Sequence, residues 1–235
     1  MFPVDGRAAG PPFAVSMKEA EEPVHCKGNR SREGRKNVMT HRVDIPVLDP
    51  EFILNAYRNA YFPMADSRTG AISWYSPDQR AIIPLDALKV PRSLRQVLHK
   101  KMFEVRVDTA FEEIIRGCAD REDTWISEEI VVAYNELHRR GYAHSVESWH
   151  ANELVGGLYG VAIGAAFFGE SMFSRMSGAS KVALVHLVEQ LRLRGFRLLD
   201  SQFMNEHIRQ FGAVEIPRGM YLKKLTTAIS SDTRF

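Results

Sequence analysis

Apolar side chains recur along the chain with two different periods, and these periods predict its helices and strands. Spacings of three and four residues, typical of helices, follow Asp49, Pro91, Asp108 and Ser127. Asp and Ser favour the N-cap position and Pro the first turn, so these four residues mark predicted helix starts. The fourth helix also ends in two arginines and a glycine, which suit a helix C-terminus.

Alternation with a period of two takes over between residues 143 and 173 and predicts three strands. Asn152 marks the turn after the first strand, and Ile163-Gly164 marks the turn after the second. Because both turns are short, the three strands are expected to pair antiparallel, as a meander.

A helix, a short strand and a second helix follow the meander. The first helix runs from Ser180 to Gly195, the strand covers residues 197–200, and Asn205 caps the second helix. A mixed sheet with this outline is typical of an α+β, acetyltransferase-like (GNAT-like) catalytic domain. Ahead of it, one helix and short strands near 72–75 and 81–83 predict a small N-terminal α+β unit.

These patterns divide the chain into three segments. Residues 1–42 are rich in Gly, Pro, Ser and charged side chains and predict a disordered tail. We assign residues 43–86 to the small N-terminal α+β domain and residues 87–230 to the acetyltransferase-like catalytic domain.

Composition narrows the class of protein only slightly. A net charge of +2 does not by itself indicate a nucleic-acid-binding protein. The two cysteines, Cys26 and Cys118, lie in unlike segments and do not suggest a disulfide framework. Without a long apolar run or an export signal, we expect a cytoplasmic protein that does not contact membranes. No repeat or heptad seam is visible, so we expect a monomer.

One short segment offers a phosphate-binding hypothesis. Residues Arg175 to Ser180 lie at the predicted junction between strand and helix, where backbone amides can bind a pyrophosphate. Their pattern partly matches the Arg-x-x-Gly-x-Gly/Ala loop of acetyl-CoA-dependent enzymes. An N-acetyltransferase is therefore one alternative function, although a plain helix cap explains the segment equally well.

Six longer strings carry a more specific resemblance. In chain order they are YFPMAD, WYSPDQR, TWIS, AYNELHRRGYAHSVESW, ELVGGLYGVAIGAAFFGESMFSRMSGASKVAL and LLDSQFMNEHIRQFGAVEIPR. Together they resemble the leucyl/phenylalanyl-tRNA–protein transferases over roughly residues 49 to 225. The pieces GGLYGVA and GESMFS are highly specific to that family.

The resemblance implies an activity and its partners. Such enzymes move Leu or Phe, and Met less well, from aminoacyl-tRNA onto the N-terminal Arg or Lys of a protein acceptor. The product carries a degradation signal of the N-end rule type. The resemblance implies an acetyltransferase-like fold in which aminoacyl-tRNA replaces acetyl-CoA, and no cofactor. A non-catalytic aminoacyl-tRNA-binding module is a further alternative.

The chemistry of this transfer requires little beyond orientation, a proton acceptor and stabilisation of an oxyanion. Asp200 and Gln202 follow the predicted buried strand two residues apart, so they are expected to point to one face. The resemblance implies that both polarise the attacking amine and that Gln202 helps to hold the carbonyl. The alternative is that Asp200 is only a turn or cap residue.

The resemblance also implies binding sites for both ends of the aminoacyl group. Its apolar side chain enters a pocket formed by Leu158, Phe167, Met172 and Leu184. Trp74 or Tyr75, together with Trp125, stack on the 3′-terminal adenosine, as aromatic side chains do on unpaired bases. The basic residues that are candidates to contact the tRNA backbone are Lys89, Arg92, Arg95, Lys100 and Lys101. A solvated basic helix is the alternative interpretation of this last group.

The string FFGESMFS contains a carboxylate, Glu170, among large apolar side chains. Strict alternation puts Phe167 and Met172 on opposite faces of a strand, whereas the resemblance places both at the pocket. We therefore predict a bulge or bend near Gly169. Glu170 then faces the cleft and binds the terminal ribose, the aminoacyl amine or the cationic acceptor.

The histidines indicate no metal site. His144 and His150 are expected on the strand face opposite to Glu147, so these three side chains cannot share a metal ion. We expect His207 at the surface or in a structural role.

Overall fold

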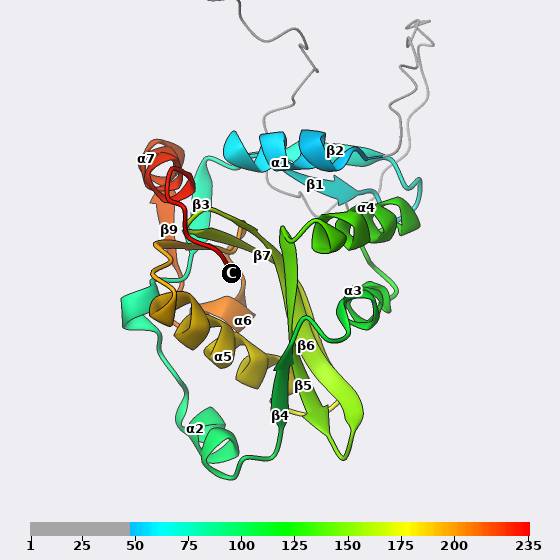
Figure 1. The fold of residues 1–235 in the computed structure, drawn as a ribbon, viewed down its shortest axis with the longest axis vertical. Coiled ribbons are helices and arrows are strands. Elements are labelled where there is room, and N and C mark those ends of the chain that lie inside the picture. Colours follow the sequence, from blue (N-terminus) through cyan, green and yellow to red (C-terminus); the bar gives the residue numbers. More distant parts are fainter. Residues whose placement is uncertain (1–47) are drawn as a thin grey trace, which may run out of the picture.

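Seven strands form one mixed sheet in the computed structural model, which describes residues 48–235 (Figure 1). Their order across the sheet is β4-β5-β6-β7-β8-β3-β9, and β1 pairs with β2 in a separate small sheet. The strands are β1 (Phe62–Ala65), β2 (Ile72–Tyr75), β3 (Gln79–Ile82), β4 (Glu104–Val107), β5 (Ala143–His150), β6 (Glu153–Ile163), β7 (Ala166–Ser174), β8 (Leu198–Asp200) and β9 (Val214–Pro217).

The predicted meander of β5, β6 and β7 is confirmed, and β8 joins it in parallel. Parallel pairing sets Phe168 of β7 beside Asp200 of β8. Because the two strands run in the same direction, the residues after Phe168 and those after Asp200 lie beyond the same end of β8. Glu170 and Gln202 are among them.

Helices cover both faces of the large sheet (Figure 1). The chain forms α1 (Pro50–Arg58), a 3-10 turn η1 (Leu85–Ala87), α2 (Arg92–His99), α3 (Phe111–Ala119), α4 (Glu128–Arg139), α5 (Ala179–Leu193), α6 (Glu206–Arg209) and α7 (Arg218–Ile229). Helices α3 and α4 lie on one face of the meander and α5 on the other, which creates two apolar cores.

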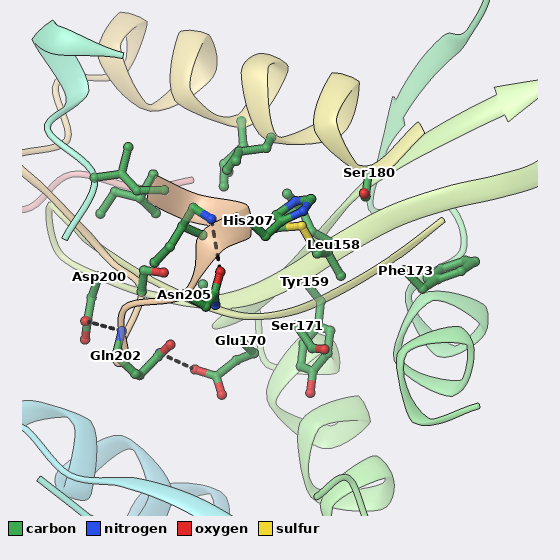
Figure 2. Close-up of a pocket in the computed structure, with 18 of the residues that line it drawn as sticks. Leu158, Tyr159, Glu170, Ser171, Phe173, Ser180, Asp200, Gln202, Asn205 and His207 are labelled. Carbon is green, nitrogen blue, oxygen red and sulfur yellow. Dashed lines mark hydrogen bonds between the residues drawn. The ribbon is translucent and has the colours of Figure 1, made fainter. Parts of the chain in front are cut away.

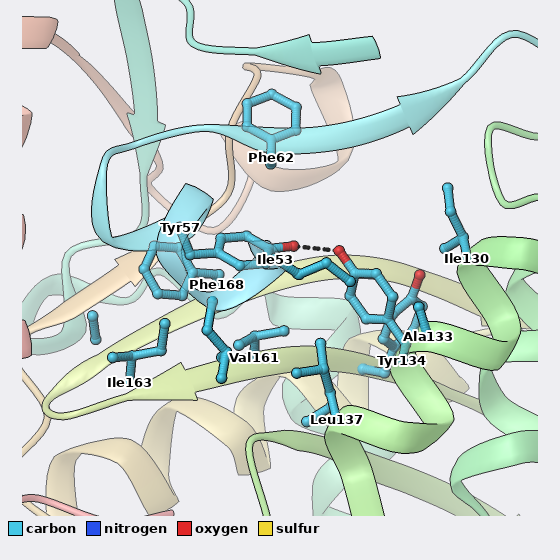
Figure 3. Packing of buried hydrophobic residues seen from close by; sticks show 14 of the residues in the cluster. Ile53, Tyr57, Phe62, Ile130, Ala133, Tyr134, Leu137, Val161, Ile163 and Phe168 are labelled. Carbon is cyan, nitrogen blue, oxygen red and sulfur yellow. Dashed lines mark hydrogen bonds between the residues drawn. The ribbon is translucent and has the colours of Figure 1, made fainter. Parts of the chain in front are cut away.

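Neighbouring residues of β7 enter different cores, as alternation requires. Figure 3 shows Phe168 in the first core against Tyr57 of α1, with ring centroids 4.7 Å apart. Phe167 belongs to the second core, with residues of α5. Both rings are fully buried, so β7 supports both layers of the molecule.

Three predicted helix caps are confirmed. The side chains of Asp49, Ser127 and Asn205 each accept a hydrogen bond from the backbone N–H three residues later. These contacts satisfy amides that the first turn of a helix leaves without a partner.

The predicted cap at Asp108 is wrong. Asp108 instead accepts a hydrogen bond from the Ser145 N–H at 2.8 Å and lies 2.8 Å from Nδ1 of His144. Helix α3 has no side-chain cap. Glu147 of β5 instead binds the segment just before the helix, accepting from the N–H groups of Thr109 and Ala110 at 2.8 and 2.7 Å.

Two elements at the end of the chain carry little sequence signal. Strand β9 is mostly exposed and α7 buries only three residues, so neither has a strong periodic pattern. Strand β3 lies inside the large sheet, between β8 and β9, although it follows the β1–β2 hairpin directly. The division at residue 86 stays a prediction, and the predicted tail of residues 1–42 lies outside the described residues.

Candidate active site

A cavity of about 700 Å³ opens beyond the end of β8, alongside the second half of β7 (Figure 2). Residues of β6, β7 and β8 form one wall, and residues of α5 and α6 form another. The connection between α3 and α4 contributes Arg121 and Trp125. The cavity therefore lies beyond the end of β8, where parallel pairing of β7 and β8 also places Glu170 and Gln202.

A β-bulge in β7 determines which side chains face this cavity. Tyr159 pairs with Ser171 and the next residue, Gly160, pairs with Gly169, so Glu170 has no partner on β6. The predicted bulge near Gly169 is thereby confirmed. Gly160 is needed opposite it, because a Cβ there would lie 2.3 Å from the carbonyl oxygen of Phe168.

The extra residue puts Phe167 and Met172 on the same side of the sheet. Both pack in the second core, with Leu158 and Leu184. Leu158, Met172 and Leu184 line the cavity directly, whereas Phe167 is fully buried behind its wall. The four residues of the predicted side-chain pocket are therefore gathered, three at the cavity surface and one beneath it.

Glu170 lies at the polar end of the cavity and is only partly exposed. Oε1 of Glu170 accepts a hydrogen bond from Nε2 of Gln202 at 3.2 Å (Figure 2). Burial raises the pKa of Glu170 to about 8; hydrogen bonding by Tyr57 opposes this rise, whereas the nearby Asp200 charge adds to it. Carboxyl groups with such a pKa are suited to exchange protons near neutral pH.

Asp200 has a contrasting environment. It is completely buried and accepts hydrogen bonds from Nε and Nη2 of Arg80, at 3.0 and 2.7 Å. The Tyr221 hydroxyl and the Gln202 N–H donate to the same carboxylate, at 2.7 and 3.0 Å. These donors satisfy Asp200 within the protein.

Gln202 connects the two carboxylates. Its backbone N–H binds Asp200, and its side-chain amide binds Glu170. Its φ angle of 55° is left-handed, an uncommon conformation for a residue other than glycine. Such conformations persist where neighbouring contacts enforce them, and here Ala81 adds an N–H to the Gln202 carbonyl oxygen at 3.0 Å.

Comparisons with known proteins agree with one another about this chain. The family model described as leucyl/phenylalanyl-tRNA protein transferase matches residues 82–226, and the model of that family's N-terminal domain matches residues 47–78. The chain belongs to the leucyl/phenylalanyl-tRNA–protein transferase family.

Individual relatives in this family are similar over most of their length. The leucyl/phenylalanyl-tRNA–protein transferase of Gloeobacter violaceus is 55% identical over 80% of this chain and 97% of its own. The proteins of the same name from Salinibacter ruber and Paramagnetospirillum magneticum are 52% and 53% identical, over 77% and 80% of this chain and 80% and 92% of their own.

A solved structure, L-PGS from Bacillus licheniformis, is a distant neighbour. It is 11% identical with a TM-score of 0.35, over 68% of this chain and 55% of its own. At that distance the membership in the transferase family rests on sequence alone.

The three aromatic residues expected to stack on adenosine lie in two places. Trp125 is half-buried and lines the cavity. Trp74 packs edge-on against Phe52, and the Tyr75 ring stacks on Phe62 at an interplanar angle of 30°, both within the N-terminal part of the chain. The structure thus brings Trp125 to the cavity and leaves Trp74 and Tyr75 outside its lining.

The expected tRNA-binding residues are all exposed. They lie on α2 and the segments beside it, where Arg92, Arg95 and Lys100 surround a shallow hollow. Lys101 lies at the end of this helix and Lys89 before it. No acidic side chain lines the hollow, so this surface presents positive charge to solvent.

The start of α5 is already hydrogen bonded within the protein. The amide of Ala179 donates to the Met176 carbonyl, and that of Ser180 donates to the Ser174 hydroxyl. Arg175 lies over the Phe173 ring and donates to a backbone carbonyl. Because these donors are engaged, the segment matches a helix cap better than a pyrophosphate cradle.

Sequence reasoning missed several residues of the site. The hydroxyls of Tyr57 in α1 and Tyr134 in α4 share a hydrogen bond (Figure 3). Hydrogen bonding by both tyrosines also lowers the pKa of Glu170, against the effect of burial. His207, expected at the surface or in a structural role, lines the cavity, and burial lowers its pKa. Arg80, which binds Asp200, was missed as well. Only Arg80 had a signal, as a lone charge followed by the apolar run Ala81 to Ile83.

Residues 48–235 contain neither an apparent metal site nor a membrane-spanning helix. In that part of the chain, no group of three His, Cys, Asp or Glu side chains is arranged to hold a metal ion. No helix there is long and apolar enough to span a membrane.

Proposed function

We propose that the protein uses this cavity to transfer Leu, Phe or Met from aminoacyl-tRNA to the N-terminal Arg or Lys of another protein. The observation that carries the proposal is the bulge, which sets Glu170 beside Gln202 at the edge of an apolar cavity of about 700 Å³. Membership in a family named for leucyl and phenylalanyl transfer from tRNA to protein supports the choice of substrates. The product acquires a degradation signal of the N-end rule type.

The reaction balances without a cofactor. The free α-amine of the acceptor attacks the ester carbonyl that joins the amino acid to the 3′-terminal ribose. A peptide bond forms, the ester C–O bond breaks, and one proton passes from the amine nitrogen to the departing ribose oxygen. The protein must orient two substrates and move that proton.

Glu170 is the proposed proton acceptor. Its pKa of about 8 is close to that of a free α-amino group, so a proton can pass between them with little free-energy difference. Gln202 orients the carboxylate through its amide N–H, and the second N–H of that amide is proposed to donate to the ester carbonyl. Asp200 acts through the Gln202 backbone. Direct contact between Asp200 and the amine stays a prediction.

The apolar part of the cavity is the proposed site for the transferred side chain. Leu158, Met172 and Leu184 supply adaptable apolar surface, with Phe167 supporting them from behind. A pocket of this kind discriminates by about 1–3 kcal/mol per methylene, which fits the acceptance of Leu, Phe and Met together.

The tRNA end is proposed to approach past Trp125. That ring lines the cavity and is the favoured adenosine platform, with Trp74 or Tyr75 as the second aromatic group. Lys89, Arg92, Arg95, Lys100 and Lys101 are proposed to bind backbone phosphates. Replacing Arg95 with Gln then weakens tRNA binding and lowers its salt dependence by about one unit of slope, measured by titration at several salt concentrations.

The catalytic part is proposed to have an acetyltransferase-like fold. An antiparallel meander followed by α5 and by β8, which pairs in parallel with β7, supports this assignment. The N-terminal helix and hairpin form the proposed smaller domain. A monomer is the proposed oligomeric state.

One assay tests the function. Purified protein is mixed with radiolabelled Leu-tRNA and a peptide that begins with Arg, and label in the peptide is measured. A peptide with an acetylated N-terminus is the matched control, and a peptide beginning with Asp tests acceptor preference. Failure to label the Arg peptide overturns the proposal. Label transferred from acetyl-CoA favours the acetyltransferase alternative, and binding of aminoacyl-tRNA without transfer favours a binding module.

A further inference from the structure

Arg80 is a buried charge that the proposed mechanism leaves unexplained. It lies in β3 with 1% of its surface exposed. An arginine is almost never this buried unless its charge is paired, and replacing a buried ion pair with apolar residues is often neutral for stability. Stability alone is therefore a weak reason for an arginine here.

The guanidinium group has partners in several segments of the chain. Nε and Nη2 bind Asp200 of β8, and Nη1 donates to the Ala60 carbonyl oxygen at 3.2 Å. The group also lies 4.6 Å from the Phe62 ring centroid and 4.7 Å from that of Tyr221. Arg80 thus contacts the N-terminal segment, the central strand and the last helix at once.

These contacts lead directly to the proposed reacting groups. Asp200, held by Arg80 and by the Tyr221 hydroxyl, accepts the Gln202 N–H at 3.0 Å and so stabilises its left-handed backbone. That backbone aims the Gln202 side chain at Glu170. Arg80 is separated from Glu170 by only two intervening residues of this network.

We propose that Arg80 is a positioning residue for aminoacyl transfer, holding Asp200 so that Gln202 and Glu170 keep their reactive geometry. The inference rests on the proposed function. Arg80 itself does not touch substrate, because its polar groups are engaged within the protein. It also balances the charge of Asp200 and so limits the repulsion between Asp200 and Glu170.

The positive charge of Arg80 and the geometry of its hydrogen bonds affect Glu170 in different ways. The groups that act on the charge of Glu170 include Tyr57 from α1, Tyr134 from α4, Tyr159 from β6, Asp200 from β8 and Arg80 from β3. Arg80 is the positive charge among them; Arg121 lines the same cavity but donates to the Ser171 hydroxyl and the Met172 carbonyl oxygen. Removal of Arg80 leaves two carboxylates together, which favours the protonated form of Glu170.

The test compares Arg80→Lys, Arg80→Met and Tyr221→Phe with wild type in the peptide-labelling assay. Arg80→Lys keeps the charge and loses the two-pronged geometry, so kcat is expected to fall about 100-fold with little change in the KM for Leu-tRNA. Arg80→Met also moves the acidic limb of the kcat–pH profile to higher pH. Tyr221→Phe removes one donor to Asp200 and lowers kcat about 2- to 10-fold.

Arg116→Lys is the matched control, because Arg116 pairs with two glutamates at an exposed site. Circular dichroism and thermal melting establish that each variant is folded, and Tyr221→Phe keeps the proposal testable if Arg80→Met is not. Wild-type kinetics in a folded Arg80→Lys, or an unmoved pH limb in a folded Arg80→Met, overturns the inference. Absence of transfer by wild type instead overturns the proposed function.

Discussion

Two glutamates in the same sheet, Glu147 of β5 and Glu170 of β7, show how differently one side chain can be used. Glu147 is fully buried and is surrounded by donors. It accepts hydrogen bonds from the backbone of Thr109 and Ala110, from the Thr109 and Ser145 hydroxyls, and from the Trp149 indole. Such a carboxylate is satisfied by the fold and has no remaining capacity for chemistry.

Glu170 lies on a bulge and borders a cavity. Its neighbours are tyrosines, an amide and a second carboxylate, and its pKa rises to about 8. At neutral pH most molecules of the free protein therefore carry a neutral Glu170. The number of hydrogen-bond donors around a glutamate therefore decides its role. A buried glutamate whose carboxylate oxygens all accept hydrogen bonds stabilises the structure, whereas one with few donors can exchange protons.

The largest effect is expected from Glu147→Ala. Loss of this carboxylate leaves the N–H groups of Thr109 and Ala110, just before α3, without their partner, at about 1–3 kcal/mol each. We expect the free energy of unfolding to fall by about 3 kcal/mol or more, measured by denaturant titration. Glu153→Ala, at an exposed position of the next strand, is the control. A loss below about 1 kcal/mol would remove the distinction between the two glutamates.

Glu170→Gln is expected to have the opposite profile. Gln resembles a protonated Glu in shape but cannot accept the proton, so kcat for transfer should fall about 100-fold. The thermal midpoint near pH 4 should change little, because the Glu170 carboxyl is then largely protonated in both the folded and the unfolded protein. Unchanged kcat would reduce Glu170 to a structural residue.

The raised pKa of Glu170 also makes the stability of the protein depend on pH. The folded pKa of Glu170, about 8, exceeds its ordinary value of 4.5, so its contribution to stability is present below pH 4.5. That contribution is lost progressively as the pH rises from 4.5 to about 8, because the unfolded state releases the proton while the folded state still keeps it. Glu170→Gln should therefore gain stability relative to wild type between pH 4.5 and 8, in denaturant titrations at several pH values. A constant difference across this range would contradict the raised pKa.

The smallest effect is expected from Ser145→Ala. It removes one of several donors to Glu147, at about 1 kcal/mol of unfolding free energy, and should leave transfer kinetics unchanged. Parallel denaturant titration and peptide labelling measure both quantities. A tenfold loss of kcat here would mean that the Glu147 region also serves the reaction.

Sequence reasoning succeeded where the cause was local. The caps at Asp49, Ser127 and Asn205 depend on residues three positions away. The bulge in β7 was predicted from the family resemblance, which places Phe167 and Met172 at one pocket although strict alternation separates them. Asp108 failed as a cap because its acceptor was taken by Ser145, 37 residues later, which no local pattern records.

The sequence by itself determined the family, the class of reaction and the periodicity of the strands that build the cavity. These follow from short strings and from side-chain spacing, which need no knowledge of distant contacts. Only the tertiary structure decided the hydrogen-bond partners and the charge of Glu147, Glu170 and Asp200. The Arg80 partner of Asp200 lies 120 residues away in the chain, and Tyr57 reaches Glu170 from α1. The charge on a buried carboxylate depends on the donors around it, and the fold alone brings those donors together.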